Sequence, residues 1–137
     1  EKHFEAPNMN SDIHFLKKKI EYGAEYIVTQ MFFDNQKYFD FVKLCRDNDI
    51  NVPIIPGLKP LSTVKHLNVL PHRFHLNLPS ELVNEVLKCN DKDDIRQVGV
   101  DWAVQQTKEL IAFGAPCVHF YTMGNTNNII KIMSNFC

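Results

Sequence analysis

The sequence predicts an α/β fold built on a parallel sheet, and three observations predict it. Short apolar runs without clean alternation are typical of strands that are covered on both faces. Longer segments with helical spacing of apolar residues lie between these runs. One local plan, an aromatic helix end followed by Gly-Ala and a buried run, occurs twice, at residues 22–30 and 113–122. Strands that alternate with helices in this way imply parallel pairing with right-handed crossovers.

The predicted elements follow in order along the chain. Apolar runs predict strands at residues 26–31, 52–58 and 117–122. Asn10 or Ser11 can cap the first helix, which ends near Tyr22 with Gly23 as its stop. Asp34 is placed to cap the second helix. Helical spacing predicts the remaining helices over residues 62–70, 80–88, 93–113 and 126–133.

Polar or turn-forming residues close each predicted strand. Gln30 ends the first strand, Pro56 and Gly57 come near the end of the second, and Tyr121 and Thr122 end the third. A (β/α)8 barrel builds its active site at this edge of the sheet. An open α/β sheet binds ligands at the same edge. The pattern favours part of a barrel, and a small open sheet stays as the alternative.

Composition narrows the class of protein. The chain has 137 residues, a formal net charge of -1 and 45% hydrophobic residues, which suits one domain with a core. The near-neutral charge gives no electrostatic reason to expect nucleic acid binding. No apolar run approaches the roughly 20 residues of a membrane helix, and no signal peptide is recognised. The cysteines are expected to be reduced thiols of a cytoplasmic protein, mostly in the core; they are Cys45, Cys89, Cys117 and Cys137.

Gln30 is the first candidate for a ligand contact. Its side chain either bonds a neighbouring loop or points into a site at the strand end, and the pattern leaves both open. An amide carries both hydrogen-bond donors and an acceptor, so it suits the edge of a heterocycle. It cannot act as a general base.

A stripe on the first helix is the second candidate. Asp12, Phe15 and Lys19 share one side, because they are spaced i, i+3, i+7. The stripe is either a solvated rim or the place where a ligand lies along the helix, with Asp12 accepting from hydroxyls and Lys19 donating to a phosphate or carbonyl.

The histidines give weaker signals. His3 lies in a loop that contains a proline, and His119 is expected to be a hydrogen-bonded interior residue. His72 and His75 lack a nearby third ligand, so no metal site is predicted. Common nucleotide and hydrolase motifs are also missing from the sequence. The residues alone indicate part of an α/β enzyme with a site at the strand ends. Another (β/α)8 enzyme with a phosphate-bearing ligand and a non-catalytic α/β ligand-binding module remain alternatives.

Five segments in order then suggest a family. They are EKHFEAPN, the helix with Asp12 and Lys19, GAEYIVTQMFFDN, VPIIPGLKP and VHFYTMGN. Together they resemble the C-terminal half of the catalytic barrel of methylenetetrahydrofolate reductase, over essentially the whole chain. The resemblance implies that residues 1–137 form the C-terminal portion of a single flavin-binding (β/α)8 TIM barrel domain, about three strand-helix units of it. It also implies reduction of 5,10-methylenetetrahydrofolate to 5-methyltetrahydrofolate with FAD and NAD(P)H, which feeds methionine synthesis.

The resemblance also implies roles for single residues. His3, Asp12 and Lys19 match positions that bind the cofactor FAD. Gln30 matches a folate contact that also borders the nicotinamide site. Leu70 matches an apolar residue that packs on the folate, and His66 stands where relatives commonly carry a folate-contacting glutamine.

Two positions depart from the family pattern, and part of the family's site is not carried by this segment. Phe15 replaces a residue that is often polar, and Asn125 stands where many relatives have a folate-binding arginine. No catalytic residue is expected in this segment, because the acidic proton donor is expected upstream of Glu1. The segment alone is therefore expected to be inactive, and the full-length protein is expected to be a homo-oligomer.

Overall fold

A three-stranded parallel sheet forms the centre of the computed structural model, which describes residues 9–137. Its strands are β1 (Ile27–Met31), β2 (Ile54–Leu58) and β3 (His119–Phe120), in the spatial order β1-β2-β3. Both strand pairs are parallel. This arrangement confirms the predicted α/β class with a parallel sheet.

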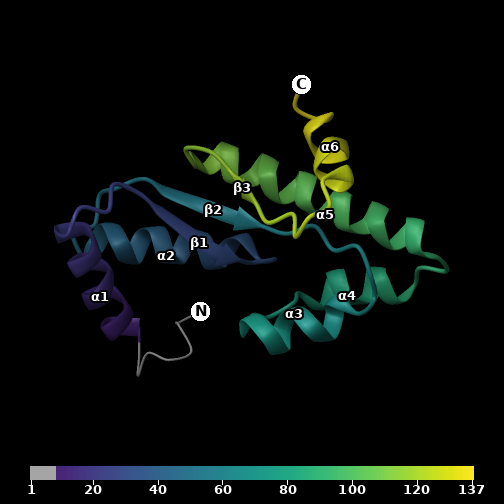
Figure 1. The fold of residues 1–137 in the computed structure, drawn as a ribbon, viewed down its shortest axis with the longest axis horizontal. Helices are drawn as coiled ribbons and strands as arrows, with labels where there is room; N and C mark the ends of the chain where they lie inside the picture. The colour runs from purple at the N-terminus through teal and green to yellow at the C-terminus, as the bar shows by residue number, and fades with distance from the viewer. Residues whose placement is uncertain (1–8) are drawn as a thin grey trace.

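Helices connect and follow the strands. They are α1 (Met9–Glu21), α2 (Asn35–Asp47), α3 (His66–Phe74), α4 (Ser80–Leu87), α5 (Lys92–Phe113) and α6 (Asn127–Met133). In Figure 1, α3 and α4 lie beyond the arrowheads of β1 and β2, whereas α1 stands at the opposite end of the sheet. The carboxyl ends of the strands therefore face α3 and α4.

Local sequence explains most of the helix boundaries. Asp34 caps α2 as predicted, because its carboxylate accepts a hydrogen bond from the backbone N–H of Gln36 at 3.0 Å. The predicted cap of α1 is wrong, since Asn10 and Ser11 lie inside the helix. The helix predicted from residue 62 begins only at His66. The preceding turn is closed by tighter i→i−3 bonds, such as the one from the His66 N–H to the Thr63 carbonyl.

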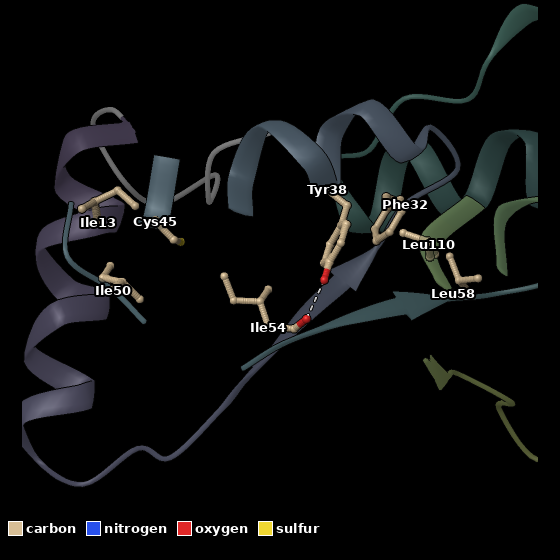
Figure 2. Packing of buried hydrophobic residues seen from close by; sticks show 8 residues of the cluster. All are labelled: Ile13, Phe32, Tyr38, Cys45, Ile50, Ile54, Leu58 and Leu110. Carbon is tan, nitrogen blue, oxygen red and sulfur yellow. Dashed lines mark hydrogen bonds between the residues drawn. The ribbon is translucent and has the colours of Figure 1, made fainter. Parts of the chain in front are cut away.

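The first hydrophobic cluster lies between the sheet, α2 and α5, and reaches α1. Its buried members, shown in Figure 2, are Ile13, Phe32, Tyr38, Cys45, Ile50, Ile54, Leu58 and Leu110. The Tyr38 hydroxyl donates to the Ile54 carbonyl at 2.7 Å, so this buried phenol is satisfied. Because Ile54 and Leu58 belong to this cluster, α2 and α5 cover one face of the sheet.

A second cluster forms where the strands end. It packs α3, α4 and α5 together through Met31, Phe33, Leu61, Leu70, Leu76, Leu82, Val86 and Ile95. Gly99 lets α5 approach the segment after β2, because a Cβ at Gly99 would collide with the Leu61 backbone. A third cluster joins α6 to α5 through Ile132 and its neighbours. The strand ends are thus held by helices that follow later in the chain.

The other face of the sheet is largely uncovered. The register pairs Val28 with Ile55, one residue on from the pair Ile27 and Ile54, so Val28 and Ile55 point away from the first cluster. Val28 is 39% exposed. Within the described residues β1 is therefore covered on one face alone, because no described helix packs on the other side (Figure 1).

Two further predictions are wrong for the described residues. His119, expected to be an interior residue, is exposed and touches only the edge of the Tyr121 ring among the described aromatic contacts. Of the cysteines, only Cys45 is buried, and Cys117 and Cys137 are exposed. Among residues 9–137, no helix combines the length and apolar character that a membrane span requires.

Candidate ligand site at the strand ends

A β-bulge interrupts β1 just before its end. The register runs from Val28 opposite Ile55 to Met31 opposite Gly57, so β1 has one more residue than β2 over this stretch. The Thr29 hydroxyl replaces the missing backbone partner, because it accepts from the Gly57 N–H at 3.0 Å. It can also donate to the Gln30 carbonyl at 3.0 Å. Bulges often redirect a side chain beside a site.

Tyr121 reaches across β2 to the same bulge. Its backbone N–H donates to the Leu58 carbonyl at 2.8 Å, which extends the pairing of β3 by one residue. Its hydroxyl donates to the Thr29 carbonyl, also at 2.8 Å. The Tyr121 ring passes over Gly57, where a Cβ would lie 2.6 Å from both the ring and the Thr29 oxygen. Only glycine leaves room for this crossing.

Gln30 lies at this bulge and is exposed. Its Oε1 accepts from the Met31 N–H at 3.0 Å. The oxygen is therefore used within the strand, and the Nε2 hydrogens remain for another partner. The bond found is to the next residue of the strand and not to a neighbouring loop, and the ligand contact of Gln30 stays a prediction.

Residues of α5 fix the two carbonyls that follow β1. The Trp102 indole donates to the Phe33 carbonyl at 2.9 Å. The buried Gln106 amide donates to the Phe32 carbonyl at 3.3 Å and to Asn35 Oδ1 at 3.0 Å. Sequence analysis missed this network. A glutamine in a long helix resembles any solvated residue, and no local signal marks its partners.

The helix α3 docks on the strand ends through Leu70. This side chain is only 1% exposed and belongs to the same cluster as Met31. Leu70 therefore forms part of the wall behind the site and shows almost no surface of its own. His66 lies one turn earlier at i−4, on the same side of α3.

The surroundings of His66 favour its neutral form. Its Nδ1 accepts from the Ser62 N–H at 3.2 Å, which requires an unprotonated Nδ1. Burial lowers the pKa of His66, and the nearby charge of Lys59 lowers it further. The neutral ring then carries its proton on Nε2 and can donate from that atom.

Lys59 directly follows β2 and is buried, with 8% of its surface exposed. Burial lowers the pKa of its ammonium group. The salt bridges among the described residues lie elsewhere, on the exposed surfaces of α2, α4 and α5. Gln30, Lys59 and His66 all belong to segments at or after the ends of β1 and β2, and each carries a hydrogen-bond donor.

The structure does not bring all predicted site residues together. Asp12 and Lys19 lie on α1, which stands away from the arrowheads of the strands (Figure 1). Phe15 is 55% exposed on the same helix. His3 lies outside the described residues. Asn125 has a structural partner, because its Oδ1 accepts from the Asn127 N–H at 3.1 Å at the start of α6.

No metal centre is found in the described part of the chain. Within residues 9–137, no group of three or more His, Cys, Asp or Glu side chains is arranged to hold an ion. His72 and His75 instead line a shallow hollow beside α3 together with Arg73.

Sequence comparison decides the family. Residues 1–137 match the family described as methylenetetrahydrofolate reductase. The chain belongs to the methylenetetrahydrofolate reductase family. It is 34% identical over 126 residues to methylenetetrahydrofolate reductase (NADH) 1 of Arabidopsis thaliana, covering 91% of this chain and 21% of the relative. It is 33% identical over 136 residues to 5,10-methylenetetrahydrofolate reductase of Buchnera aphidicola subsp. Schizaphis graminum, covering 98% and 46%.

A solved structure shares the fold. It is titled an uncharacterized protein from Clostridium thermocellum that binds two copies of 5-methyl-5,6,7,8-tetrahydrofolic acid. The TM-score is 0.64 at 20% identity, and the match covers 93% of this chain and 48% of that one. Compared with the two reductases named above, the chain spans about a fifth of the plant protein and about half of the bacterial one.

Proposed function

We propose that these residues are the C-terminal portion of the catalytic barrel of a flavin-dependent methylenetetrahydrofolate reductase. The full-length protein would reduce 5,10-methylenetetrahydrofolate to 5-methyltetrahydrofolate with NAD(P)H as the electron donor, and its product would serve methionine synthesis. The observation that carries the proposal is the placement of Gln30 by the bulge at the end of β1, in a chain that belongs to this family.

Gln30 has a defined polarity in this proposal. Since its Oε1 already accepts from the Met31 N–H, its Nε2 donates to a carbonyl oxygen or ring nitrogen of the folate. His66 Nε2 adds a second donor from α3. Leu70 supports this wall from behind as part of the buried cluster, rather than by an exposed contact.

FAD, when bound, supplies the hydride chemistry. We assign Asp12 and Lys19 to a part of this cofactor that lies away from the folate. Asp12 offers a carboxylate for hydroxyls and Lys19 an exposed ammonium for a phosphate, and they lie about 10 Å apart along the axis of α1. The proposed role of His3 at the cofactor concerns a residue outside the described range.

The proposed architecture is a (β/α)8 barrel in which residues 1–137 form one part. The bare face of the sheet supports it, because the inner face of a barrel is covered only when the other strands are present. The catalytic acid would then belong to the remainder of the domain. We also propose that the full-length reductase is a cytoplasmic homo-oligomer, as expected from the family resemblance.

Two substitutions of Gln30 in the full-length protein test the folate contact. Gln30→Ala removes the amide, and Gln30→Glu keeps an oxygen for the Met31 N–H but removes the donor. Both should weaken binding of 5-methyltetrahydrofolate about tenfold, the worth of one well-placed hydrogen bond. Titration calorimetry measures the affinity, and the flavin absorbance of the purified protein should stay unchanged.

Gln97→Ala is the matched control, because Gln97 is an exposed glutamine on α5 whose amide bonds only Asp101 among the described residues. It should leave folate affinity unchanged. Full folate affinity in both Gln30 variants would refute the assigned contact. Loss of FAD with folate binding intact would place Gln30 at the cofactor instead.

A further inference from the structure

Gln30 lies in the irregular part of β1, between the ladder pairs of Val28 and Met31. In a regular strand, Gln30 would point to the same side as Val28, two residues earlier. Burial along β1 keeps this alternation, because Gln30 is exposed like Val28, but the register shift between Val28 and Met31 leaves Gln30 without a regular ladder partner on β2. Side-chain hydrogen bonds from Thr29 and Tyr121 take its place.

Tyr121 is the member of this network that comes from outside β1 and β2. Its hydroxyl, next to β3, donates to the Thr29 carbonyl. The Thr29 hydroxyl in turn accepts from the Gly57 N–H and can donate to the Gln30 carbonyl. Burial raises the pKa of Tyr121, so the phenol keeps the proton that it donates. The Thr29–Gln30 peptide is thereby held at two points, the carbonyl oxygen of Thr29 and the hydroxyl of Thr29.

We propose that Tyr121 is a positioning residue for Gln30: its hydroxyl fixes the bulge and thereby directs the Gln30 Nε2 toward an acceptor atom of the folate ring system. The folate part of this inference rests on the proposed function. The positioning part rests on the bulge geometry alone. Gly57 is required for the same contact, because any Cβ at this position would meet both the Tyr121 ring and the Thr29 oxygen at 2.6 Å.

The test uses Tyr121→Phe in the full-length protein, which removes the hydroxyl and keeps the ring. Tyr22→Phe is the matched control, since Tyr22 is 90% exposed. Hydrogen exchange followed by mass spectrometry should show faster exchange in peptides covering residues 27–33 and 54–60 of Tyr121→Phe only. Unchanged exchange in both peptides would overturn the positioning role.

Affinity for 5-methyltetrahydrofolate gives the second measurement. Tyr121→Phe should weaken it about fivefold, within the range expected for one lost hydrogen bond. In a Gln30→Ala background the same substitution should change affinity less than twofold, because it then has no side chain to direct. A purely structural tyrosine would give additive losses, and that result would overturn the proposal.

The two measurements separate the possible failures. If Gln30→Ala alone leaves folate affinity unchanged, the folate contact of the proposed function is wrong. The exchange result then still decides whether Tyr121 holds the bulge. If exchange quickens in Tyr121→Phe and the affinity losses are non-additive, both inferences are supported.

Discussion

The two faces of the three-stranded sheet meet different surroundings. On the face covered by α2 and α5, Ile54 is 1% and Leu58 0% exposed. On the other face, Val28 is 39% exposed and His119 is exposed as well. The covered face is completed by helices of this chain. The bare face carries the apolar Val28 and Ile55 beside the polar His119, and no described helix covers it.

A substitution that places a charge on the bare face is expected to have the largest effect on stability. If the remainder of a barrel covers this face in the full-length protein, Val28→Asp buries an unpaired carboxylate and should lower the free energy of unfolding by about 4 kcal/mol. Urea denaturation of the full-length protein measures this change.

Val69→Asp is the control for this prediction, because Val69 is similarly exposed at 44% but lies on α3. It should change stability by about 0.5 kcal/mol or less. Equal, small effects of the two substitutions would mean that the face stays open to solvent. That outcome would favour a self-contained α/β module over a partial barrel.

Removing a buried polar side chain of α5 tests how this helix holds the segment that follows β1. Gln106→Ala leaves the Phe32 carbonyl and Asn35 Oδ1 without this donor. Because both groups are buried from water, the loss should be about 2 kcal/mol by urea denaturation. Gln105→Ala removes an exposed neighbour that bonds Glu109 and should cost about 0.5 kcal/mol or less. Similar losses for both would contradict the network's structural role.

The smallest expected effect is a pH dependence at His66. Its pKa is lowered in the folded state by burial and by Lys59, so the unfolded chain binds the proton more tightly. Stability should therefore fall as pH drops below about 6.5, the ordinary pKa of the side chain, and level off below the folded-state pKa. His66→Gln should remove this part of the pH profile of the urea midpoint, whereas His72→Gln at an exposed site should not. If His66→Gln left the pH profile of the urea midpoint unchanged, the predicted link between the His66 pKa and stability would be wrong.

Local signals in the sequence were sufficient for the class of fold and for much of its order. The Asp34 cap, the helix stop at Gly23 and the long α5 follow from side-chain chemistry within a few residues. Gln30 was also found by a local signal, as a polar residue at the end of an apolar run. The bond that its Oε1 accepts from the Met31 N–H was not predicted, because no pattern in the sequence marks it.

The rest depends on contacts between distant segments. Gln106 and Phe32 are separated by 74 positions, and Tyr121 and Thr29 by 92. No periodicity in either segment marks these partners. The exposure of His119 was mispredicted for a related reason. An apolar strand predicts that other residues pack on its faces, but it does not show which segment of the protein supplies them. The barrel itself stays a prediction.

The hydrogen bond from Tyr121 to Thr29 also sets an order of folding. During synthesis Thr29 and Gln30 leave the ribosome long before Tyr121, so the bulge has no anchor until β3 has been made. Contacts that span so much of the sequence form late, since a large loop must close before they contribute. The strand end that carries Gln30 is therefore among the last parts of this segment to become rigid, and a nascent chain that stops before β3 would hold the glutamine without its final orientation.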